Sequence, residues 1–455
     1  MEKNQLQRKL GARQIQMIAL GGAIGVGLFM GSASTIAWTG PSVILAYLVA
    51  GMFLYLIMRA LGEMLYVQPN SGSFSHFASH YLGGSFGYVT AWSNVFEYLI
   101  VGMSEIIAVG TYMKYWWPDL PGIVPGVIAI VTLALANLIS VKLFGELEFW
   151  FAFIKVLTIV LMILAGFGLI FFGFGNGGHP VGFSNLWAHG GFFTGGVKGF
   201  FFALSIVVSS YQGIELLGMT AGEAENPQKT ITKAIQSTVG RILVFYVGAI
   251  FVIVTVYPWN ELSTLGSPFV QIFSKIGISF AAGLINFVVL TAALSGCNSG
   301  IFSSSRMLYS MSIRGEMPKF FSRLSRTGVP VYPVMTMSLG ILIGFILNEC
   351  IPFVFPNISN LFIIVFSSSV LPGMIPWIVI LLSQIEFRKQ HADLMVDHPF
   401  KMPFSPYSNY ATLAFLAIVL LFMFINPATR ISLIVGIVFL IVVRFDYKRR
   451  FPNKK

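Results

Sequence analysis

The sequence has little charge and almost no cysteine. Asp, Glu, Lys and Arg make up only 10% of the 455 residues, whereas 56% are hydrophobic and the mean hydropathy is +0.80. Because a soluble domain carries about 25% charged residues, this composition excludes a soluble enzyme or binding domain and indicates a protein that crosses the bilayer many times. The two cysteines, Cys297 and Cys350, do not indicate a disulfide framework.

Apolar runs of about 20 residues recur along the whole chain, and each is long enough to cross a bilayer of roughly 30 Å as a helix. No small-residue cleavage site follows the first run, so we interpret it as a retained span rather than a signal peptide. We predict an all-α integral membrane protein with twelve transmembrane helices. The predicted spans are 15–37, 41–62, 84–114, 122–140, 149–174, 196–221, 237–257, 277–305, 331–349, 356–383, 408–426 and 429–446.

Basic residues set the expected orientation, because cytoplasmic loops of membrane proteins carry an excess of Lys and Arg. With both termini in the cytoplasm, most of the 28 lysines and arginines fall in cytoplasmic segments. The residues left outside are Lys114, Lys198, Lys275 and Arg430, and Lys155 lies within the fifth span. The net charge of +11 therefore reflects membrane orientation, and no nucleic acid partner is expected.

The first span contains the run GGAIGVGLFMG, Gly21 to Gly31. Each glycine weakens a helix by roughly 1 kcal/mol relative to alanine. One interpretation is helix packing, because Gly21-xxx-Gly25 matches the small-xxx-small pattern of close helix contacts. The other is a deliberate break in the helix. A nucleotide-binding loop is not expected, since the spacing is not G-x-G-x-x-G and no strand precedes it.

The sixth span favours the second interpretation. It places Ser209, Ser210, Gln212, Gly213 and Glu215 in the middle of the membrane. Broken spans at corresponding places in two halves of a chain are the best sequence indication of a transporter site. Unwound backbone is tolerated there only where it lines a cavity or meets a ligand. Freed amides that donate to a carboxylate and carbonyls that accept from an ammonium together describe a site for an amino acid zwitterion.

Five long blocks resemble the amino acid–polyamine–organocation superfamily, and within it the bacterial amino acid permeases. They are IALGGAIGVGLFMGSA, PNSGSFSHFASHYLG, FGELEFWFAFIKV, GIELLGMTAGEAENPQKTITKAI and INFVVLTAALSGCNSGIFSSSRMLYSM. The resemblance implies a leucine-transporter-type fold, in which two inverted repeats of five helices with broken helices 1 and 6 are followed by two C-terminal helices. The nearest likeness is to the alanine, serine and glycine branch, which includes carriers of D-isomers.

The resemblance also implies the substrate-binding residues. In the first span the main chain of five residues is expected to hold the carboxylate: Ala23, Ile24, Gly25, Val26 and Gly27. In the sixth span five residues are expected to contact the amine and the side chain: Ser209, Ser210, Tyr211, Gly213 and Ile214. The family often has a gating aromatic residue where this chain has Ser209, so Tyr211 is the alternative candidate for that gate.

Lys155 lies among apolar residues, and an ionisable group inside a span is a functional hypothesis by default. In related permeases the fifth-span lysine lies against the first and eighth spans, where sodium-coupled relatives bind an ion. The resemblance thus implies proton coupling at Lys155; the alternative is a fixed structural cation bonded to carbonyls of the broken first span. Glu105, Glu215 and Asn298 are possible accessory residues. Glu215 is expected to support the unwound backbone, and Asn298 to bond across helices or line the cavity.

No cofactor, metal site or catalytic residue is expected. His76 and His80 have the spacing of a metal pair on a helix, but no third ligand is near, and a zinc site normally needs three or four. No nucleophile and base pair is evident, so an enzyme is the least favoured reading.

We predict a secondary transporter that imports small neutral amino acids (alanine, serine, glycine, D-isomers) across a bacterial plasma membrane by proton symport, without an obligate protein partner. The alternatives are a carrier of aromatic amino acids or proline, an amino acid exchanger, and a transporter-like sensor or channel. The expected organisation is a cytoplasmic tail at 1–14, one transmembrane domain at 15–446 and a basic tail at 447–455. Within the domain we expect repeats at 15–174 and 196–383 and extra helices at 408–446.

Overall fold

The computed structural model describes residues 11–69, 73–220, 227–262, 269, 279–354 and 361–452. Regular structure in these residues is helical, apart from an isolated bridge between Leu324 and Pro330. The α-helices are α1 (Ala12–Ala23), α2 (Val26–Phe29), α3 (Gly31–Thr39), α4 (Val43–Val67), α5 (Ser73–Phe77), α6 (Gly84–Met113), α7 (Ile123–Ile139), α8 (Val141–Phe167), α9 (Gly196–Ser209), α10 (Leu216–Thr220), α11 (Pro227–Val256), α12 (Trp259–Leu262), α14 (Ser279–Ile313), α15 (Val331–Val354), α16 (Leu361–Ser367), α17 (Val370–Gln390), α18 (Tyr407–Ile425) and α19 (Pro427–Arg450). Short 3-10 or π segments are η1 (Gly40–Ser42), η2 (Ala78–Leu82), η3 (Gly168–Phe172), η4 (Ser184–Leu186), η6 (Lys319–Ser322) and η7 (Asp393–Met395).

Helices that could cross a membrane dominate the structure. In the described ranges, 8 helical runs have the length and composition of a span: Gly31–Val67, Gly84–Met113, Val141–Phe172, Gly283–Ile313, Val331–Ile351, Phe362–Gln390, Tyr407–Ile425 and Pro427–Arg450. Shorter apolar helical segments lie at Arg13–Phe29, Ile123–Ile139, Gly196–Ser209 and Leu243–Val256. The prediction of an all-helical protein with many membrane spans is therefore confirmed.

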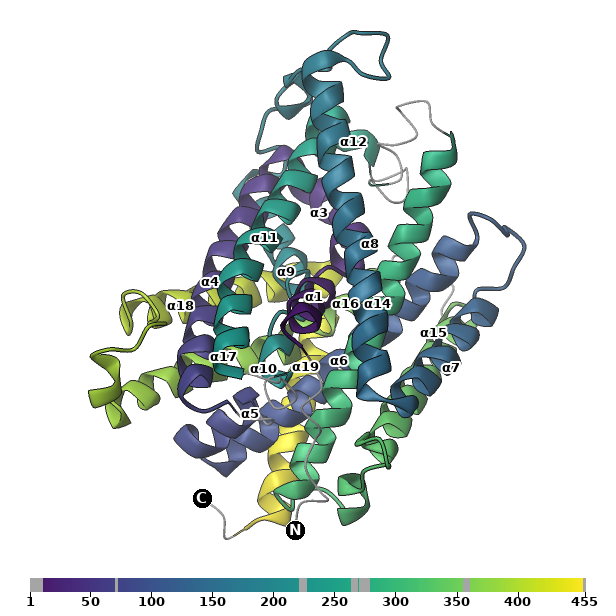
Figure 1. The fold of residues 1–455 in the computed structure, drawn as a ribbon. Coiled ribbons are helices and arrows are strands. Elements are labelled where there is room, and N and C mark those ends of the chain that lie inside the picture. The colour runs from purple at the N-terminus through teal and green to yellow at the C-terminus, as the bar shows by residue number, and fades with distance from the viewer. Residues whose placement is uncertain are drawn as a thin grey trace.

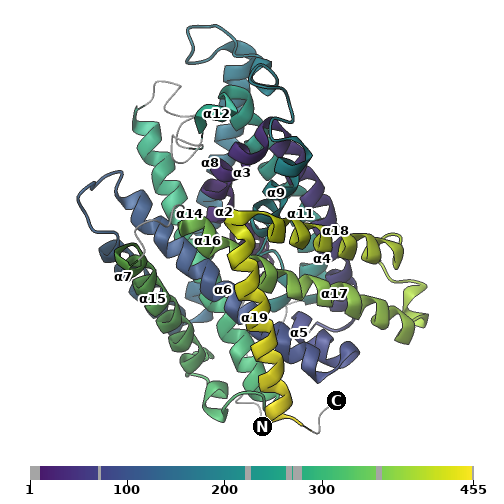
Figure 2. The same ribbon diagram turned by 180° about the vertical axis from the view of Figure 1, so that it is seen from behind.

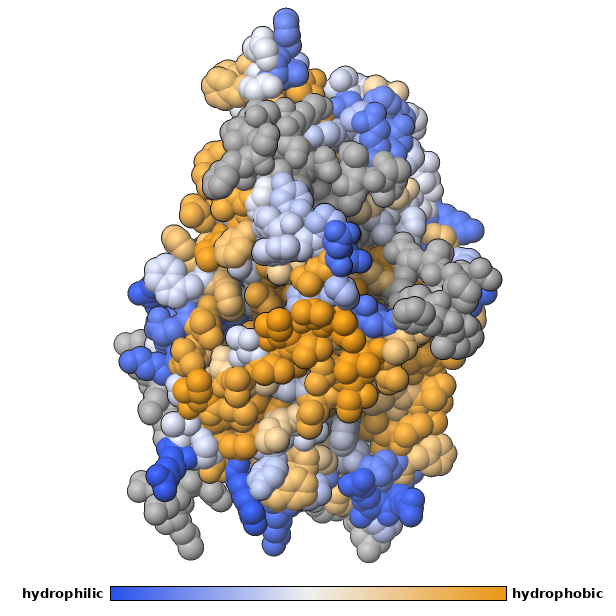
Figure 3. Space-filling view, turned by 90° about the vertical axis from the view of Figure 1, so that its right-hand side faces the viewer, coloured by the Kyte–Doolittle hydropathy of each residue, from blue (hydrophilic) through white to orange (hydrophobic). Residues whose placement is uncertain are grey.

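The surface carries the apolar band expected of such a protein. Figure 3 shows hydrophobic side chains gathered around the middle of one face, with hydrophilic side chains at both ends. Ile128 and Leu135 on α7 and Leu339, Ile343 and Leu347 on α15 are large apolar side chains left exposed. Exposed apolar side chains on this scale are costly in water and favourable against lipid tails.

Local sequence signals set several helix ends. The Ser140 side chain accepts a hydrogen bond from the Leu143 amide at 3.1 Å, which caps the N-terminus of α8. Asn426 caps α19 by accepting from the Ala428 amide at 3.1 Å, and Pro427 follows at the first helical position, where its missing N–H costs nothing.

The helix α1 lies at the centre of the molecule. It packs against α8, α11 and α14 (Figure 1), while α9 packs against α3 and α4. On the opposite side, α19 runs along α6 and also contacts α16, as Figure 2 shows. The interrupted helices α1–α2 and α9–α10 are therefore enclosed by continuous ones.

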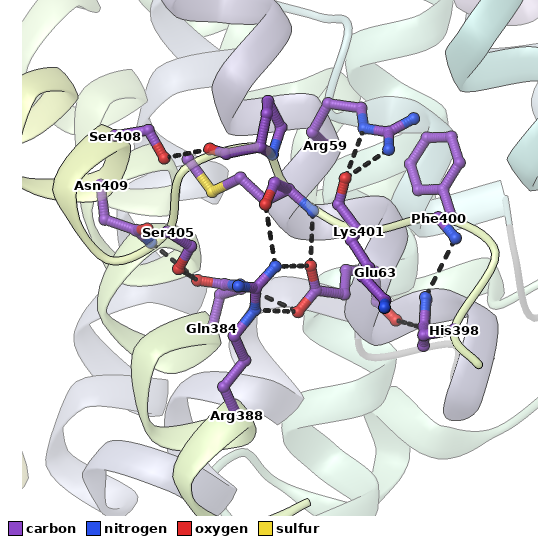
Figure 4. A network of polar contacts seen from close by, with 12 residues as sticks. Arg59, Glu63, Gln384, Arg388, His398, Phe400, Lys401, Ser405, Ser408 and Asn409 are labelled. Carbon is purple, nitrogen blue, oxygen red and sulfur yellow. Dashed lines mark hydrogen bonds and ion pairs between the residues drawn. The ribbon is translucent and has the colours of Figure 1, made fainter. Parts of the chain in front are cut away.

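A polar cluster, the Glu63 clasp, joins the ends of α4 and α17 (Figure 4). The Glu63 carboxylate accepts hydrogen bonds from Gln384 Nε2 at 2.9 Å, from Arg388 Nε and Nη2 at 2.7 Å each, and from the Met402 amide at 2.6 Å. Arg59 reinforces the clasp by donating to the Lys401 carbonyl. The clasp thus fastens the segment between α17 and α18 to α4.

His398 completes the Glu63 clasp from the segment that it fastens. Its Nδ1 accepts from the Phe400 amide at 3.1 Å, so Nε2 carries the proton and donates to the Glu63 carbonyl at 3.0 Å. Burial lowers the pKa of His398; Arg388 and Lys401 act in the same direction, whereas Glu63 opposes them. The clasp therefore favours neutral His398.

Candidate functional site

The first helix breaks inside the glycine run. The helix α1 ends at Ala23, and the backbone leaves the helical region at Ile24 (φ −85°, ψ 88°) and Gly25 (φ −120°, ψ −163°) before α2 begins at Val26. Packing depends on the missing side chain as well, because a Cβ on Gly25 would lie 2.5 Å from Glu105 Oε1. The interpretation of the run as a break, rather than only a packing surface, agrees with the structure.

The second helix breaks between α9 and α10, at residues 210–215. Gly213 adopts φ +105°, a conformation that favours glycine. The Glu215 carboxylate accepts from the Gly213 amide at 3.0 Å, from Tyr98 Oη at 2.8 Å and from Trp377 Nε1 at 3.1 Å. The Glu215 carboxylate therefore bonds the unwound backbone at Gly213, at the end of the break.

A third break, which the sequence analysis missed, separates α16 from α17 at Ser368 and Ser369. Within the helical run Phe362–Gln390, this turn interrupts the regular helix in the described part of the span predicted at 356–383. Ser369 Oγ donates to Gln212 Oε1 at 3.2 Å, so the third break is bonded to the second. The signal was present in the serine run 367–369 and in Pro372, which cannot donate a helical hydrogen bond.

These breaks meet at a small polar cavity. Its volume is ≈ 20 Å³, little more than the roughly 10–15 Å³ that one water needs. The cavity is lined by Gly22, Gly25, Gly27, Tyr98, Val101, Glu105, Ser209, Ser210, Gln212, Gly296 and Phe366.

Only part of the predicted site lines this cavity. Gly25, Gly27, Ser209 and Ser210 do so, each from one of the two predicted breaks. The other predicted residues that the structure describes lie behind the lining: Ile24, Val26, Tyr211, Gly213 and Ile214. Of Ala23 the structure describes the backbone, at the end of α1, and its side chain lies outside the description.

Tyr211 is directed away from the cavity. Its hydroxyl donates to the Tyr47 carbonyl at 2.9 Å, and its ring stacks on Tyr246 with centroids 4.6 Å apart. The aromatic ring that does line the cavity is Phe366 on α16, whose Cζ would lie 2.8 Å from a Cβ on Gly27. Phe366 could not be assigned from sequence, because its approach to Gly27 depends on how α16 packs.

Lys155 lies next to the first break. Its Nζ donates to the Gly21 carbonyl at 2.6 Å, to the Ile24 carbonyl at 3.0 Å and to Ser295 Oγ on α14 at 2.9 Å. Three acceptors match the three N–H donors of an ammonium. The side chain is fully buried, between the first and eighth predicted spans as the resemblance implied.

Glu148, which the sequence analysis did not single out, is part of the same cluster. The Ser295 hydroxyl donates to Glu148 Oε1, and Asn298 Nδ2 donates to Glu148 Oε2 at 3.3 Å. Asn298 also accepts from Asn137 Nδ2 at 2.7 Å. Asn298 thus bonds across helices and does not appear in the cavity lining.

Glu105 lines the cavity directly. Its Oε1 accepts from the Val26 amide at 3.3 Å, at the start of α2, while Oε2 has no hydrogen-bond partner among the described residues. A carboxylate at a helix N-terminus is favourably placed. Within the described part of the chain, no group of three or more His, Cys, Asp or Glu could hold a metal ion.

Comparison with known proteins identifies the family. The profile described as amino acid permease matches residues 14–455. The chain belongs to the amino acid permease family. It is 62% identical over 447 residues to the probable threonine/serine transporter YbxG of Bacillus subtilis (strain 168), which covers 98% of this chain and 96% of YbxG.

Two further Bacillus subtilis relatives match over nearly their full length. The uncharacterized amino acid permease YtnA is 46% identical over 455 residues, or 100% of this chain and 97% of YtnA. The amino-acid permease AapA is 44% identical over 447 residues, or 98% of this chain and 96% of AapA. The permease is therefore a membrane transporter whose substrate is an amino acid, and not an enzyme.

Proposed function

We propose that this permease imports small neutral amino acids, serine and threonine foremost, by proton symport across a bacterial plasma membrane. The observation that carries the proposal is the meeting of two broken helices at one polar cavity next to a buried lysine. Alanine and glycine remain in the proposed substrate range, as do D-isomers, because a cavity built from backbone groups and hydroxyls admits any small side chain.

The proposed substrate pose uses the two breaks for the two charged groups. The carboxylate lies at the backbone of residues 23–27, near the start of α2, and the amine and side chain lie against residues 209–214. Glu105 already accepts from the Val26 amide. Because two carboxylates repel at one N–H group, we expect Glu105 to move away or to carry a proton when substrate binds.

The polar lining of the cavity supports a hydroxyl-bearing substrate. Ser209, Ser210 and Gln212 offer side-chain hydrogen bonds, while Phe366 limits the space beside Gly27. A site that hydrogen-bonds a substrate hydroxyl favours serine and threonine over alanine and glycine. The printed name of YbxG, a probable threonine/serine transporter, agrees with this choice.

Lys155 is the proposed coupling residue. As an ammonium it bonds two carbonyls of α1 and fixes that half-helix. As a neutral amine it has only two N–H donors for three acceptors, so one of these bonds is lost and α1 is freed to move. Protonation of Lys155 would thus bias the equilibrium between outward-open and inward-open states.

The proposed topology has twelve spans, formed by the 8 long runs and the four shorter apolar segments. The proposed inverted repeats are residues 15–174 and 196–383, followed by two further helices in 408–446 and flanked by cytoplasmic tails. This arrangement places the break of α1–α2 and that of α9–α10 at equivalent positions.

Uptake into proteoliposomes without internal amino acid tests the proposal. A proton gradient alone should drive serine to a higher concentration inside than outside, and Lys155→Gln should abolish that accumulation. Lys142→Gln, an exposed residue at the start of the same helix, is the matched control. Accumulation only after loading with internal amino acid would identify an exchanger, and no uptake in either condition would favour a sensor. A competition panel of the twenty amino acids and their D-isomers tests the substrate range.

A further inference from the structure

Glu148 is a buried carboxylate inside a membrane-spanning helix that the proposed transport step leaves unused. Its side chain is fully buried, and it lies on α8, seven residues before Lys155. Seven residues are almost two helical turns, so both residues lie on one face of α8, with their Cα atoms roughly 10 Å apart along its axis. Both point toward α1 and α14.

Ser295 connects the two charged groups. Its Oγ accepts from Lys155 Nζ at 2.9 Å and donates to Glu148 Oε1. The direction of both bonds is fixed, because an ammonium can only donate and a carboxylate can only accept. The three groups therefore form a continuous hydrogen-bonded chain, Lys155 to Ser295 to Glu148, and each proton is already placed for transfer in one direction.

We propose that Glu148 takes up the proton that Lys155 releases, with the Ser295 hydroxyl as the relay. A Lys155 N–H bond breaks and its proton passes to Ser295 Oγ, while the hydroxyl proton of Ser295 passes to Glu148 Oε1. The products are a neutral amine, an unchanged serine hydroxyl and a neutral carboxyl group. Release of that proton from Glu148 restores the carboxylate and completes the cycle.

The surroundings of Glu148 fit this role. On α8 it faces Lys155, on α6 the charged neighbour is Glu105, and on α14 the neighbours are Ser295, Asn298 and Ser299. Arg13 of α1 is engaged with the ring of Phe149, at 3.7 Å from the ring centroid. The transfer converts a buried ion pair into a buried neutral pair, which avoids the desolvation cost of two separated charges.

Glu148 also lies directly against α1. A Cβ on Gly21 would lie 2.8 Å from Glu148 Oε1, so the carboxyl group lies directly against the half-helix that Lys155 holds. Loss of the Lys155 proton weakens the hold on α1, and the same step makes Glu148 neutral beside it. Proton transfer and release of α1 would therefore be one event.

The inference rests on the proposed coupling at Lys155, so the experiment must separate the two. Glu148→Gln, Ser295→Ala and Lys155→Gln are reconstituted in proteoliposomes, and serine accumulation, proton flux reported by an internal pH-sensitive dye, and counterflow exchange are measured. Glu146→Gln is the matched control, because Glu146 is exposed on the same helix and bonds only Gln14 among the described residues.

A positioned side chain accelerates proton transfer by about 10²–10⁴-fold, so Glu148→Gln and Ser295→Ala should each lower accumulation and substrate-coupled proton flux by at least roughly tenfold. Counterflow, which needs no net proton movement, should fall much less. Equal losses in all three measurements would show a merely structural role and overturn the inference. Should Glu148→Gln fail to fold, Ser295→Ala decides, because it removes the relay and leaves both charges.

The Lys155→Gln variant distinguishes a failure of the Glu148 relay from a failure of the proposed coupling at Lys155. If Lys155→Gln abolishes accumulation while Glu148→Gln and Ser295→Ala accumulate serine with the pH profile of the unaltered protein, the relay is wrong and the proposed coupling stands. If Lys155→Gln itself accumulates serine normally, the proposed coupling fails and the relay fails with it.

Discussion

In the Glu63 clasp, we predict that removing the charge of Arg388 destabilises the protein more than removing the charge of Glu63. The Glu63 side chain is fully buried, whereas the Arg388 side chain is 24% exposed. Among the described residues, Arg388→Gln leaves the buried carboxylate with Gln384 and the Met402 amide as its donors. Glu63→Gln leaves a guanidinium that reaches water and still donates to the Met402 carbonyl at 2.9 Å. Removing the cation should therefore cost more than removing the anion.

The magnitudes follow from burial. Breaking a buried ion pair so that a charge is left uncompensated costs about 3–5 kcal/mol, which we expect for Arg388→Gln. An unsatisfied group that retains partial hydration costs about 1–3 kcal/mol, which we expect for Glu63→Gln. At about 2 °C per kcal/mol, the melting temperature should fall by roughly 6–10 °C for Arg388→Gln and by roughly 2–6 °C for Glu63→Gln.

Thermal unfolding of the purified variants in detergent measures both shifts. The double variant should be more stable than the sum of the single losses implies, with a coupling energy of about 0.5–3 kcal/mol. Lys389→Gln is the control, because its ion pair with Glu386 is exposed, and such pairs contribute about 0–1 kcal/mol. A Glu63→Gln loss equal to or larger than the Arg388→Gln loss, or strictly additive losses, would refute this reasoning.

Three further predictions concern the cavity and the clasp. Phe366→Ala should enlarge the cavity beside Gly27, so that valine or leucine inhibits serine uptake at least roughly tenfold more strongly; an unchanged competition panel would exclude Phe366 as a size filter. Gly27→Ala places a Cβ 2.9 Å from the Ser210 backbone and should raise the KM for serine at least roughly tenfold. Gly240→Ala is the control: its Cβ meets no neighbouring atom within 4 Å, so transport should be unchanged. Because burial lowers the pKa of His398, the folded protein binds fewer protons there than the unfolded protein. The stability that this residue contributes is fully present above the unfolded pKa of about 6.5 and is lost as the pH falls below it. The melting temperature of His398→Gln should lack that part of the decline, and melting temperatures that fall in parallel with pH for both proteins would contradict a lowered pKa of His398.

The breaks show which features can be read from sequence. Gly25 and Gly213 carry local signals, and both breaks were predicted. Gly213 needs glycine for its positive φ, whereas Gly25 is extended and needs it because a Cβ would lie 2.5 Å from Glu105 Oε1. The break at Ser368 and Ser369 carries a weaker signal, since serine also occurs in unbroken membrane helices, bonded to the preceding turn. Ser368 does bond in this way, donating to the Ile364 carbonyl at 2.8 Å.

The cavity lining shows the limit of such prediction. Tyr98, Gly296 and Phe366 come from α6, α14 and α16, and only tertiary packing brings them together. Glu148 could have been found, because its separation of seven residues from Lys155 places both on one helical face. The predicted fifth span begins at residue 149, so Glu148 falls just outside it.

The four helix ends at the two breaks are not equally compensated. The C-terminal end of α1 carries partial negative charge and is bonded by the Lys155 ammonium. The N-terminal end of α10 carries partial positive charge, and the Glu215 carboxylate accepts from Gly213 just before it. The chain thus supplies an ion of the right sign for one end at each break.

The remaining two ends lack an equally strong partner. At the end of α9, the Ser210 carbonyl accepts at 2.8 Å from the uncharged hydroxyl of Tyr246. At the start of α2, the contact between Val26 and Glu105 is long, at 3.3 Å. An ammonium is favoured at the first of these ends and a carboxylate at the second. A zwitterion placed between them would supply both charges at once, so the proposed site favours a free amino acid over an amine or a carboxylic acid alone.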